Sequence, residues 1–177
     1  MRSRSLLLPL LVVSLAGCGG GGSNTDVSGG NYAQDLRFSN TGSTNATTTR
    51  VTSQVFGDAA FANQGAAGKR GTVTVAFGST ATLQRSLTVV VTDPTTDLVA
   101  EESFVVGGTG MASELTYSER SGTSVRTWTA TGGTVDVIFR SNRQLALRLN
   151  DVRFQPVAST DATGTFTLNG KVWGEVD

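Results

Sequence analysis

Hydrophobic and polar residues alternate one by one along most of the chain beyond residue 31. In 72–77 and 85–92, valine, leucine and phenylalanine occupy every second position, and threonine fills many of the positions between them. The same alternation occurs in 134–140 and 166–176. Strict alternation over four to eight residues is typical of half-buried antiparallel strands, and valine and threonine both favour strands. The pattern therefore predicts an all-β fold.

Ten segments carry this strand signal, and turn residues separate most of them. Outside these segments, only 58–64 and 97–102 could form a helical turn, because each opens with an aspartate, a residue that caps helices. The predicted strands are 34–39, 50–56, 72–77, 85–92, 101–106, 112–118, 124–130, 134–140, 143–154 and 163–176.

This number of short strands predicts an antiparallel β-sandwich of about eight to ten strands, with a small closed β-barrel as the alternative. We favour the sandwich because the connections 57–71 and 93–100 are long and irregular, as in Greek-key folds. Shorter connections in the second half of the chain predict hairpins. Their turns are Ser121-Gly122, Gly132-Gly133 and Ser141-Asn142.

Each of the last two predicted strands contains one irregularity. In 143–154 the apolar residues move from odd to even positions near Asn150 and Asp151. One extra residue shifts the side-chain alternation of a strand in this way, so the sequence predicts a β-bulge there. The pair Asn169-Gly170 could be a hairpin turn, but the alternation continues across it. We therefore expect one long final strand.

The composition excludes several classes of site. The chain has 177 residues, no histidine and one cysteine. These counts exclude His-dependent catalytic triads, cysteine-rich zinc sites and disulfides within the chain. The 14 basic and 14 acidic side chains give a formal charge of zero, whereas nucleic-acid-binding proteins normally carry a basic excess. We therefore predict no cofactor and no nucleic-acid partner.

The first 18 residues have the pattern of a bacterial export signal. Arg2 and Arg4 precede ten nearly continuous apolar residues, 6–15. Ten residues extend only about 15 Å as a helix, against a bilayer core of about 30 Å, so the segment predicts the apolar part of a signal peptide. The sequence Leu15-Ala16-Gly17-Cys18 completes this region, and it resembles the lipobox of bacterial lipoproteins at all four positions.

The resemblance implies a lipid anchor. In lipoproteins the signal peptide, here 1–17, is removed, the cysteine thiol receives diacylglycerol, and the new amino terminus usually receives a fatty acid such as palmitate. Cys18 would then be the lipidated residue and the membrane a partner of the chain. Gly19 stands where an aspartate would favour the inner membrane in enteric bacteria. The resemblance therefore implies the outer membrane as the location within the cell envelope.

Two further segments complete the predicted organisation. Residues 18–30 are rich in glycine and serine, so we expect a flexible tether with a reach of roughly 20 Å. Residues 31–177 are expected to form the single β-sandwich domain. A Cys-Gly-rich leader before a β domain is also similar to the arrangement in transferrin-binding-type surface lipoproteins, and this similarity is confined to the leader.

Two kinds of side chain are candidates for ligand contact. Trp173 lies opposite the predicted apolar face of the last strand and could offer an aromatic platform to a glycan or a protein, whereas Trp128 is predicted to lie in the core. Arg148 and Arg153 belong to a basic cluster with Arg140 and Arg143. Such a cluster could bind an anion, but the alternative of a solvated sheet face is the stronger one.

Acidic side chains supply two weaker candidates. Asp93 and Asp97 lie in an acidic loop whose oxygens could hold calcium, but Asp-Pro-Thr-Thr is also an ordinary turn, so we predict no metal site. A pair of carboxylates could catalyse glycoside hydrolysis without histidine. Glu114, Glu119 and Asp136 are the candidates by residue type, and no spacing rule links them.

Three hypotheses of function follow. The first is a lipid-anchored envelope lipoprotein with a non-catalytic β-sandwich that has a structural or binding role. The second is a surface lipoprotein that captures an envelope glycan or a protein through Trp173 or the arginine-rich face. The third is a carboxylate-dependent glycoside hydrolase. The absence of histidine favours binding over catalysis, so we expect no enzyme activity.

Overall fold

The computed structural model describes residues 32–40, 42–80 and 82–177, and these ranges contain ten strands and no helix. The signal peptide, the lipobox with Cys18 and the tether lie outside the described residues. In the part of the chain that is described, no helix has the length and apolar character needed to cross a membrane.

The strands follow one another with short connections through most of the chain. In chain order they are β1 (Gln34–Asn40), β2 (Val51–Ser53), β3 (Gly57–Gln64), β4 (Gly68–Thr80), β5 (Leu83–Asp93), β6 (Ser103–Val106), β7 (Ala112–Ser121), β8 (Ser124–Arg140), β9 (Gln144–Pro156) and β10 (Phe166–Glu175).

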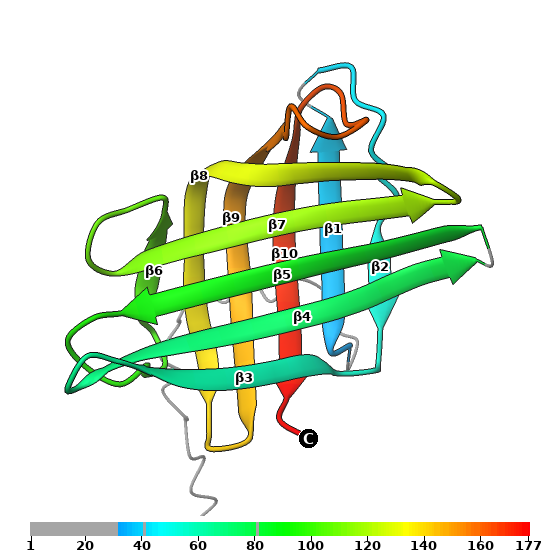
Figure 1. Ribbon diagram of the computed structural model, residues 1–177. Helices are drawn as coiled ribbons and strands as arrows, with labels where there is room; N and C mark the ends of the chain where they lie inside the picture. The colour runs from blue at the N-terminus through cyan, green and yellow to red at the C-terminus, as the bar shows by residue number, and fades with distance from the viewer. Residues whose placement is uncertain (1–31, 41, 81) are drawn as a thin grey trace, which may run out of the picture.

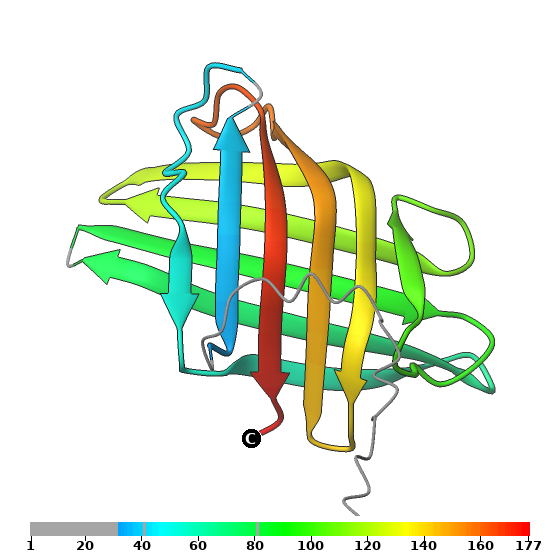
Figure 2. The same cartoon turned by 180° about the vertical axis from the view of Figure 1, so that it is seen from behind.

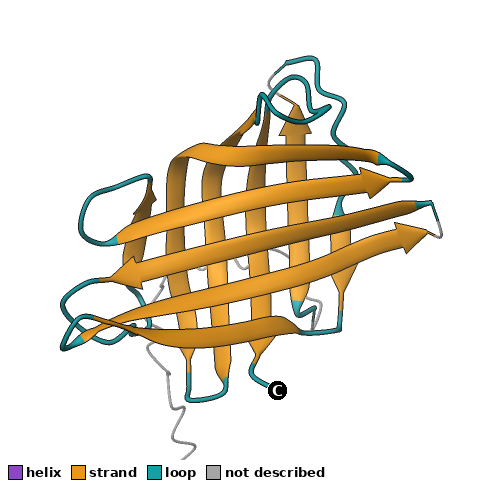
Figure 3. Ribbon diagram, viewed as in Figure 1, coloured by secondary structure: helices purple, strands orange, loops and turns teal. Residues whose placement is uncertain are grey.

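The strands form two layers that cross at a steep angle (Figure 1, Figure 3). The front layer contains β3, β4, β5, β7 and the first half of β8, and the back layer contains the rest of β8 with β9, β10, β1 and β2 (Figure 2). Most neighbouring strands are antiparallel, and two short parallel pairings join β10 to β3 and β6 to β7. The predicted all-β sandwich is confirmed.

The core lies between the layers and is built from the side chains that alternate along each strand. At its centre, Phe154 and Phe166 stack with ring centroids 4.9 Å apart, and Tyr117 and Trp128 contact Phe166 at 5.4 and 5.8 Å. Trp128 is fully buried, and its indole N–H donates to the carbonyl of Gly164 at 3.2 Å. The expectation that Trp128 lies in the core is therefore confirmed.

The strand β8 differs from the prediction. We expected a hairpin turn at Gly132-Gly133 between two strands, 124–130 and 134–140, but β8 is one strand from Ser124 to Arg140. It bends as it passes from the front layer to the back layer (Figure 1), and its register with β9 shifts on both sides of Gly132. Gly133 has a φ of 102°, which side chains other than glycine rarely adopt. The pair therefore makes a corner instead of a turn.

The segment 57–71 also differs from the prediction. The possible helical turn at 58–64 and the irregular connection were wrong, because β3 pairs with β4 from Asp58 to Gln64 in a regular antiparallel hairpin. Ala59 is buried and Phe61 packs against the core, so the alternation was present but carried by small residues. The segment 97–102 contains a turn and no helix.

The β-bulge predicted in 143–154 and the single long strand predicted at the end of the chain are both confirmed. In β9, Leu149 pairs with Gly170 and Val152 pairs with Leu168, so two residues of β9 lie opposite one residue of β10. Asp151, inside this β-bulge, has a φ of 48°. The final strand β10 is continuous from Phe166 to Glu175.

Candidate functional site

An aromatic cluster covers one corner of the outer face of the back layer. Trp173 of β10 and Phe139 of β8 both lie beside Ala146 of β9 in the strand register, and their rings are 5.3 Å apart. Phe56, from the connection between β2 and β3, packs against Trp173 at 5.7 Å with the rings nearly perpendicular. Ala146 is fully buried although it lies on the outer face, which the rings above it explain.

The cluster is open to solvent on one side. Val55 is 74% exposed, Phe56 is 43% exposed and Phe139 is 39% exposed. Trp173 is half-buried at the centre, and its indole nitrogen is buried without a hydrogen-bond partner among the described residues. We call Val55, Phe56, Phe139 and Trp173 the aromatic corner. Trp173 is thus the middle of an aromatic cluster, on the face opposite the apolar side of its strand.

Gln34, at the start of β1, holds the aromatic corner in place. Its side-chain amide is buried and donates to the carbonyl of Val55 at 3.2 Å and to the carbonyl of Trp173 at 3.0 Å. The backbone N–H of Trp173 donates to the side-chain oxygen of Gln34 at 3.4 Å. One amide therefore ties together three segments that are far apart in the sequence.

Two cations lie next to the corner on the same outer face. Lys171 is two residues before Trp173 on β10, and Arg148 of β9 is its register neighbour. Asp35 and Asp136 flank this pair across the sheet, but Asp35 is bound by Arg50 through two contacts of 2.9 Å. Within the described residues, neither Lys171 nor Arg148 forms an ion pair with a carboxylate.

The arginines that are close in sequence do not form one cluster. Arg153 lies beyond the β-bulge, opposite Thr167. Arg140 turns the other way, because the register shift between Val137 and Phe139 changes the side-chain alternation. Its guanidinium lies 3.8 Å from the ring centroid of Phe61. Arg148 and Arg153 therefore share an outer face, and Arg140 is part of the fold.

The three carboxylates considered for hydrolysis lie in different parts of the molecule. Glu114 is exposed on β7, in the front layer, and Asp136 lies on the outer face of the back layer. Glu119 is fully buried between the layers, where it accepts hydrogen bonds from the Tyr117 hydroxyl at 2.7 Å and the Thr47 backbone at 2.6 Å. Burial and the Glu119 carboxylate raise the pKa of Tyr117 well above its usual range.

Asp93 and Asp97 are both engaged by neighbouring residues. The backbone N–H of Thr95 donates to Asp93 at 2.7 Å, and the Thr95 hydroxyl and both donors of Thr96 complete its contacts. These hydrogen bonds lower the pKa of Asp93 to about 2. Asp97 lies 3.6 Å from Arg140. Among the described residues, no three His, Cys, Asp or Glu side chains are grouped to hold a metal ion.

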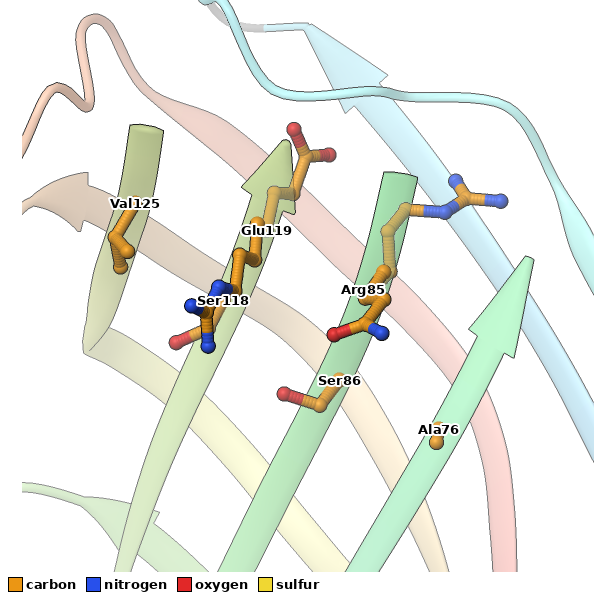
Figure 4. A pocket seen from close by; sticks show the side chains of 8 residues that line it. Ala76, Arg85, Ser86, Ser118, Glu119 and Val125 are labelled. Carbon is orange, nitrogen blue, oxygen red and sulfur yellow. The ribbon is translucent and has the colours of Figure 1, made fainter. Parts of the chain in front are cut away.

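Two of the shallow hollows formed by the described residues bear on the candidate site. One, of about 540 Å³, lies over the front layer and is lined by Ser86, Ser118 and Val125, while the side chains of Arg85 and Glu119 extend away from it (Figure 4). The other, of about 440 Å³, adjoins the aromatic corner. Its charged lining residues are Asp58, Arg143, Glu175 and Asp177.

From the sequence, Trp173, Arg148 and Arg153 were candidates for ligand contact, whereas the other members of the aromatic corner, Val55, Phe56 and Phe139, were not identified. Phe56 and Phe139 are 83 positions apart, and the pairing of β8, β9 and β10 together with the hydrogen bonds of Gln34 brings them to Trp173. Comparison of the chain with protein-family models, with curated proteins and with solved structures finds no match.

Proposed function

We propose that this chain is a lipid-anchored protein of the bacterial cell envelope, at the outer membrane, and that its β-sandwich acts by binding. The lipobox ending at Cys18 supports the anchor. The aromatic corner is the observation that carries the binding role. Exposed aromatic side chains at a packed cluster are typical of contact surfaces, because large rings bury much area with little loss of side-chain freedom.

The arrangement of charges favours binding over catalysis. Glu114, Glu119 and Asp136 do not share a face, so they offer no pair of carboxylates across a cleft. The contact surface in this proposal consists of the aromatic corner with Lys171 and Arg148 beside it. An envelope glycan or an envelope protein would both suit a surface that combines rings and cations.

The anchor is tested separately from the binding role. Globomycin, which blocks lipoprotein signal cleavage, should cause the unprocessed precursor to accumulate. The substitution Cys18→Ser should move the protein from the membrane fraction to the soluble fraction of cells. A Cys18→Ser protein that stays with the membrane, together with normal processing in globomycin, would contradict the proposed anchor.

The contact surface is tested by site-specific photo-crosslinking in cells. A benzophenone side chain is placed at Phe139, and the matched control places it at Val125, which has a similar exposure of 44% on the outer face of the other layer. Crosslinked products should form from position 139 and be much weaker from position 125. Equal products at both positions would show that the aromatic corner has no special role in binding.

A further inference from the structure

We propose that the aromatic corner docks on the lipid bilayer that holds the Cys18 anchor, so that the sandwich lies against the membrane in one orientation. This inference rests on the proposed lipid anchor, and it assigns the aromatic corner to the membrane instead of a glycan or a protein. Its occupant is the interfacial region of the bilayer, where phospholipid headgroups meet the acyl chains.

The first argument is where the chain enters the sandwich. Tyr32 is the first described residue, and Gln34, two positions later, donates to the carbonyls of Val55 and Trp173. The chain from the anchor therefore arrives beside the aromatic corner, where β1 begins next to the connection between β2 and β3 (Figure 1). Thirteen residues lie between Cys18 and Tyr32, and even a fully extended chain from one to the other spans at most about 50 Å.

The second argument is the chemistry of the corner. Val55 and Phe56 occupy a connection between strands, and they are the side chains of the cluster that project furthest into solvent, as their exposures of 74% and 43% indicate. Aliphatic and aromatic residues at such a tip suit the boundary between headgroups and acyl chains. Tryptophan is enriched at the same boundary in membrane proteins. Trp173, behind the tip, would lie at headgroup level.

The third argument is the charge around the corner. The adjoining hollow carries Asp58, Glu175 and Asp177 with Arg143, and Lys171 and Arg148 lie further along the outer face. Acidic and basic side chains are therefore mixed around the corner, because Asp35 and Asp136 flank Lys171 and Arg148. Anionic headgroups would attract the basic side chains and repel the acidic ones. The contact therefore depends on the burial of apolar side chains. We expect docking on zwitterionic phosphatidylcholine and little change with salt.

A second exposed apolar side chain provides a control. Val105 of β6 is 53% exposed and pairs with Thr134, five positions before Phe139 on β8. In Figure 1, β6 lies across the molecule from β2 and from the start of β1. The chain from the anchor does not enter beside β6, so Val105 should stay in water when the aromatic corner meets the bilayer.

The test uses the full lipidated chain in phosphatidylcholine vesicles, with and without dibrominated phosphatidylcholine as a short-range quencher of tryptophan. The brominated lipid should lower the emission of Trp173 by about half, because its ring would lie at the headgroup boundary. Trp128 is fully buried in the core and should not respond. In Trp173→Phe the lipid-dependent quenching should therefore disappear while the emission of Trp128 remains.

Two substitutions separate docking from folding. Val55→Ser and Phe56→Ser should each weaken the quenching of Trp173, and the exposed control Val105→Ser should leave it unchanged. Circular dichroism of each variant confirms that the sandwich is folded.

Two outcomes separate docking from the anchor. Unquenched Trp173 in protein that floats with the vesicles would overturn docking and leave the anchor intact. Protein that does not float would contradict the anchor itself. Protection of Trp173 from acrylamide by peptidoglycan fragments, without any effect of brominated lipid, would assign the corner to a glycan and also overturn docking.

Discussion

The hydroxyl of Tyr117 donates to Oε1 of Glu119 at 2.7 Å, and both side chains are fully buried. The same carboxylate accepts the backbone N–H of Thr47 at 2.6 Å, and Arg126 lies 3.5 Å from its second oxygen. Arg126 also donates to the carbonyl of Asn45 at 2.6 Å. Through these contacts, Glu119 links the connection between β1 and β2 to the interior of the sandwich.

Removing the hydroxyl of Tyr117 should destabilise the fold. Tyr117→Phe keeps the ring packing but takes one donor from a buried carboxylate, so we expect a loss of about 1–2 kcal/mol in the free energy of unfolding. Urea denaturation followed by circular dichroism measures this loss. Tyr32→Phe, at the exposed second tyrosine, is the control and should change the stability by less than about 0.5 kcal/mol. Equal midpoints for the two variants would show that the hydrogen bond to Glu119 does not stabilise the fold.

Asp93 should make the free energy of unfolding depend on pH in the acid range. Hydrogen bonds from Thr95 and Thr96 lower its pKa to about 2 from 3.8 in the unfolded chain, so the unfolded state binds the proton more tightly. Its contribution to stability is therefore complete above about pH 5 and is lost as the pH falls through about 2. Asp93→Asn should cost about 1–2 kcal/mol at neutral pH, because its amide nitrogen cannot accept these donors.

Urea denaturation at low pH tests whether the Asp93 carboxylate causes this pH dependence. The difference in unfolding free energy between the unmodified chain and Asp93→Asn should shrink between pH 4 and pH 2, where the carboxylate of the unmodified chain becomes protonated. Asp58→Asn, an exposed aspartate on β3, is the matched control. If Asp58→Asn altered the acid dependence as much as Asp93→Asn, the turn around Asp93 would not be its source.

The strand positions were predictable wherever large apolar residues alternate with small polar ones. In 85–92 this alternation follows directly from burial on one face, and β5 lies there. In β3 the buried positions are Ala59 and the partly buried Phe61, and alanine fits a helix as well as a strand. The strand forms because β4 lies alongside it, and a single sequence does not contain that information.

The aromatic corner was only partly predictable for a related reason. Trp173 was identifiable as a large side chain opposite the apolar face of its strand, and the structure places it there. Phe56 and Phe139 reach it only through the pairing of β8, β9 and β10 and the hydrogen bonds of Gln34. The expected grouping of Arg140 with Arg148 does not occur, because a register shift turns Arg140 towards Phe61 and leaves Arg148 on the outer face. Strand register, which depends on tertiary contacts, decides both outcomes.

The two glycines at the corner of β8 should respond differently to the same substitution. A Cβ at Gly132 would meet no atom within 4 Å, so Gly132→Ala should be neutral or stabilise the fold by up to about 1 kcal/mol. A Cβ at Gly133 would lie 2.6 Å from the carbonyl oxygen of Asp151, at a φ of 102°. Gly133→Ala should therefore cost about 3 kcal/mol. Thermal denaturation of the two variants checks this, and similar melting temperatures would mean that β8 does not need its corner at Gly133.

The contact of Arg140 with Phe61 should stabilise the packing of β8 against β3. The guanidinium lies 3.8 Å from the ring centroid and 3.6 Å from Asp97, and the Arg140 side chain is 14% exposed. A partly desolvated cation over an aromatic face contributes about 1–2 kcal/mol. Arg140→Met and Phe61→Leu should each destabilise the fold, and the double variant should lose less than the sum of the two.

A double-mutant cycle measures this coupling directly, because it removes the effects that each substitution has by itself. We expect a coupling energy of about 1 kcal/mol between Arg140 and Phe61. The control cycle pairs Arg148→Met with Phe61→Leu. Arg148 is exposed on the outer face of the back layer, away from the ring, so these two changes should be additive. A coupling as large for Arg148 as for Arg140 would contradict a specific contact between the guanidinium and Phe61.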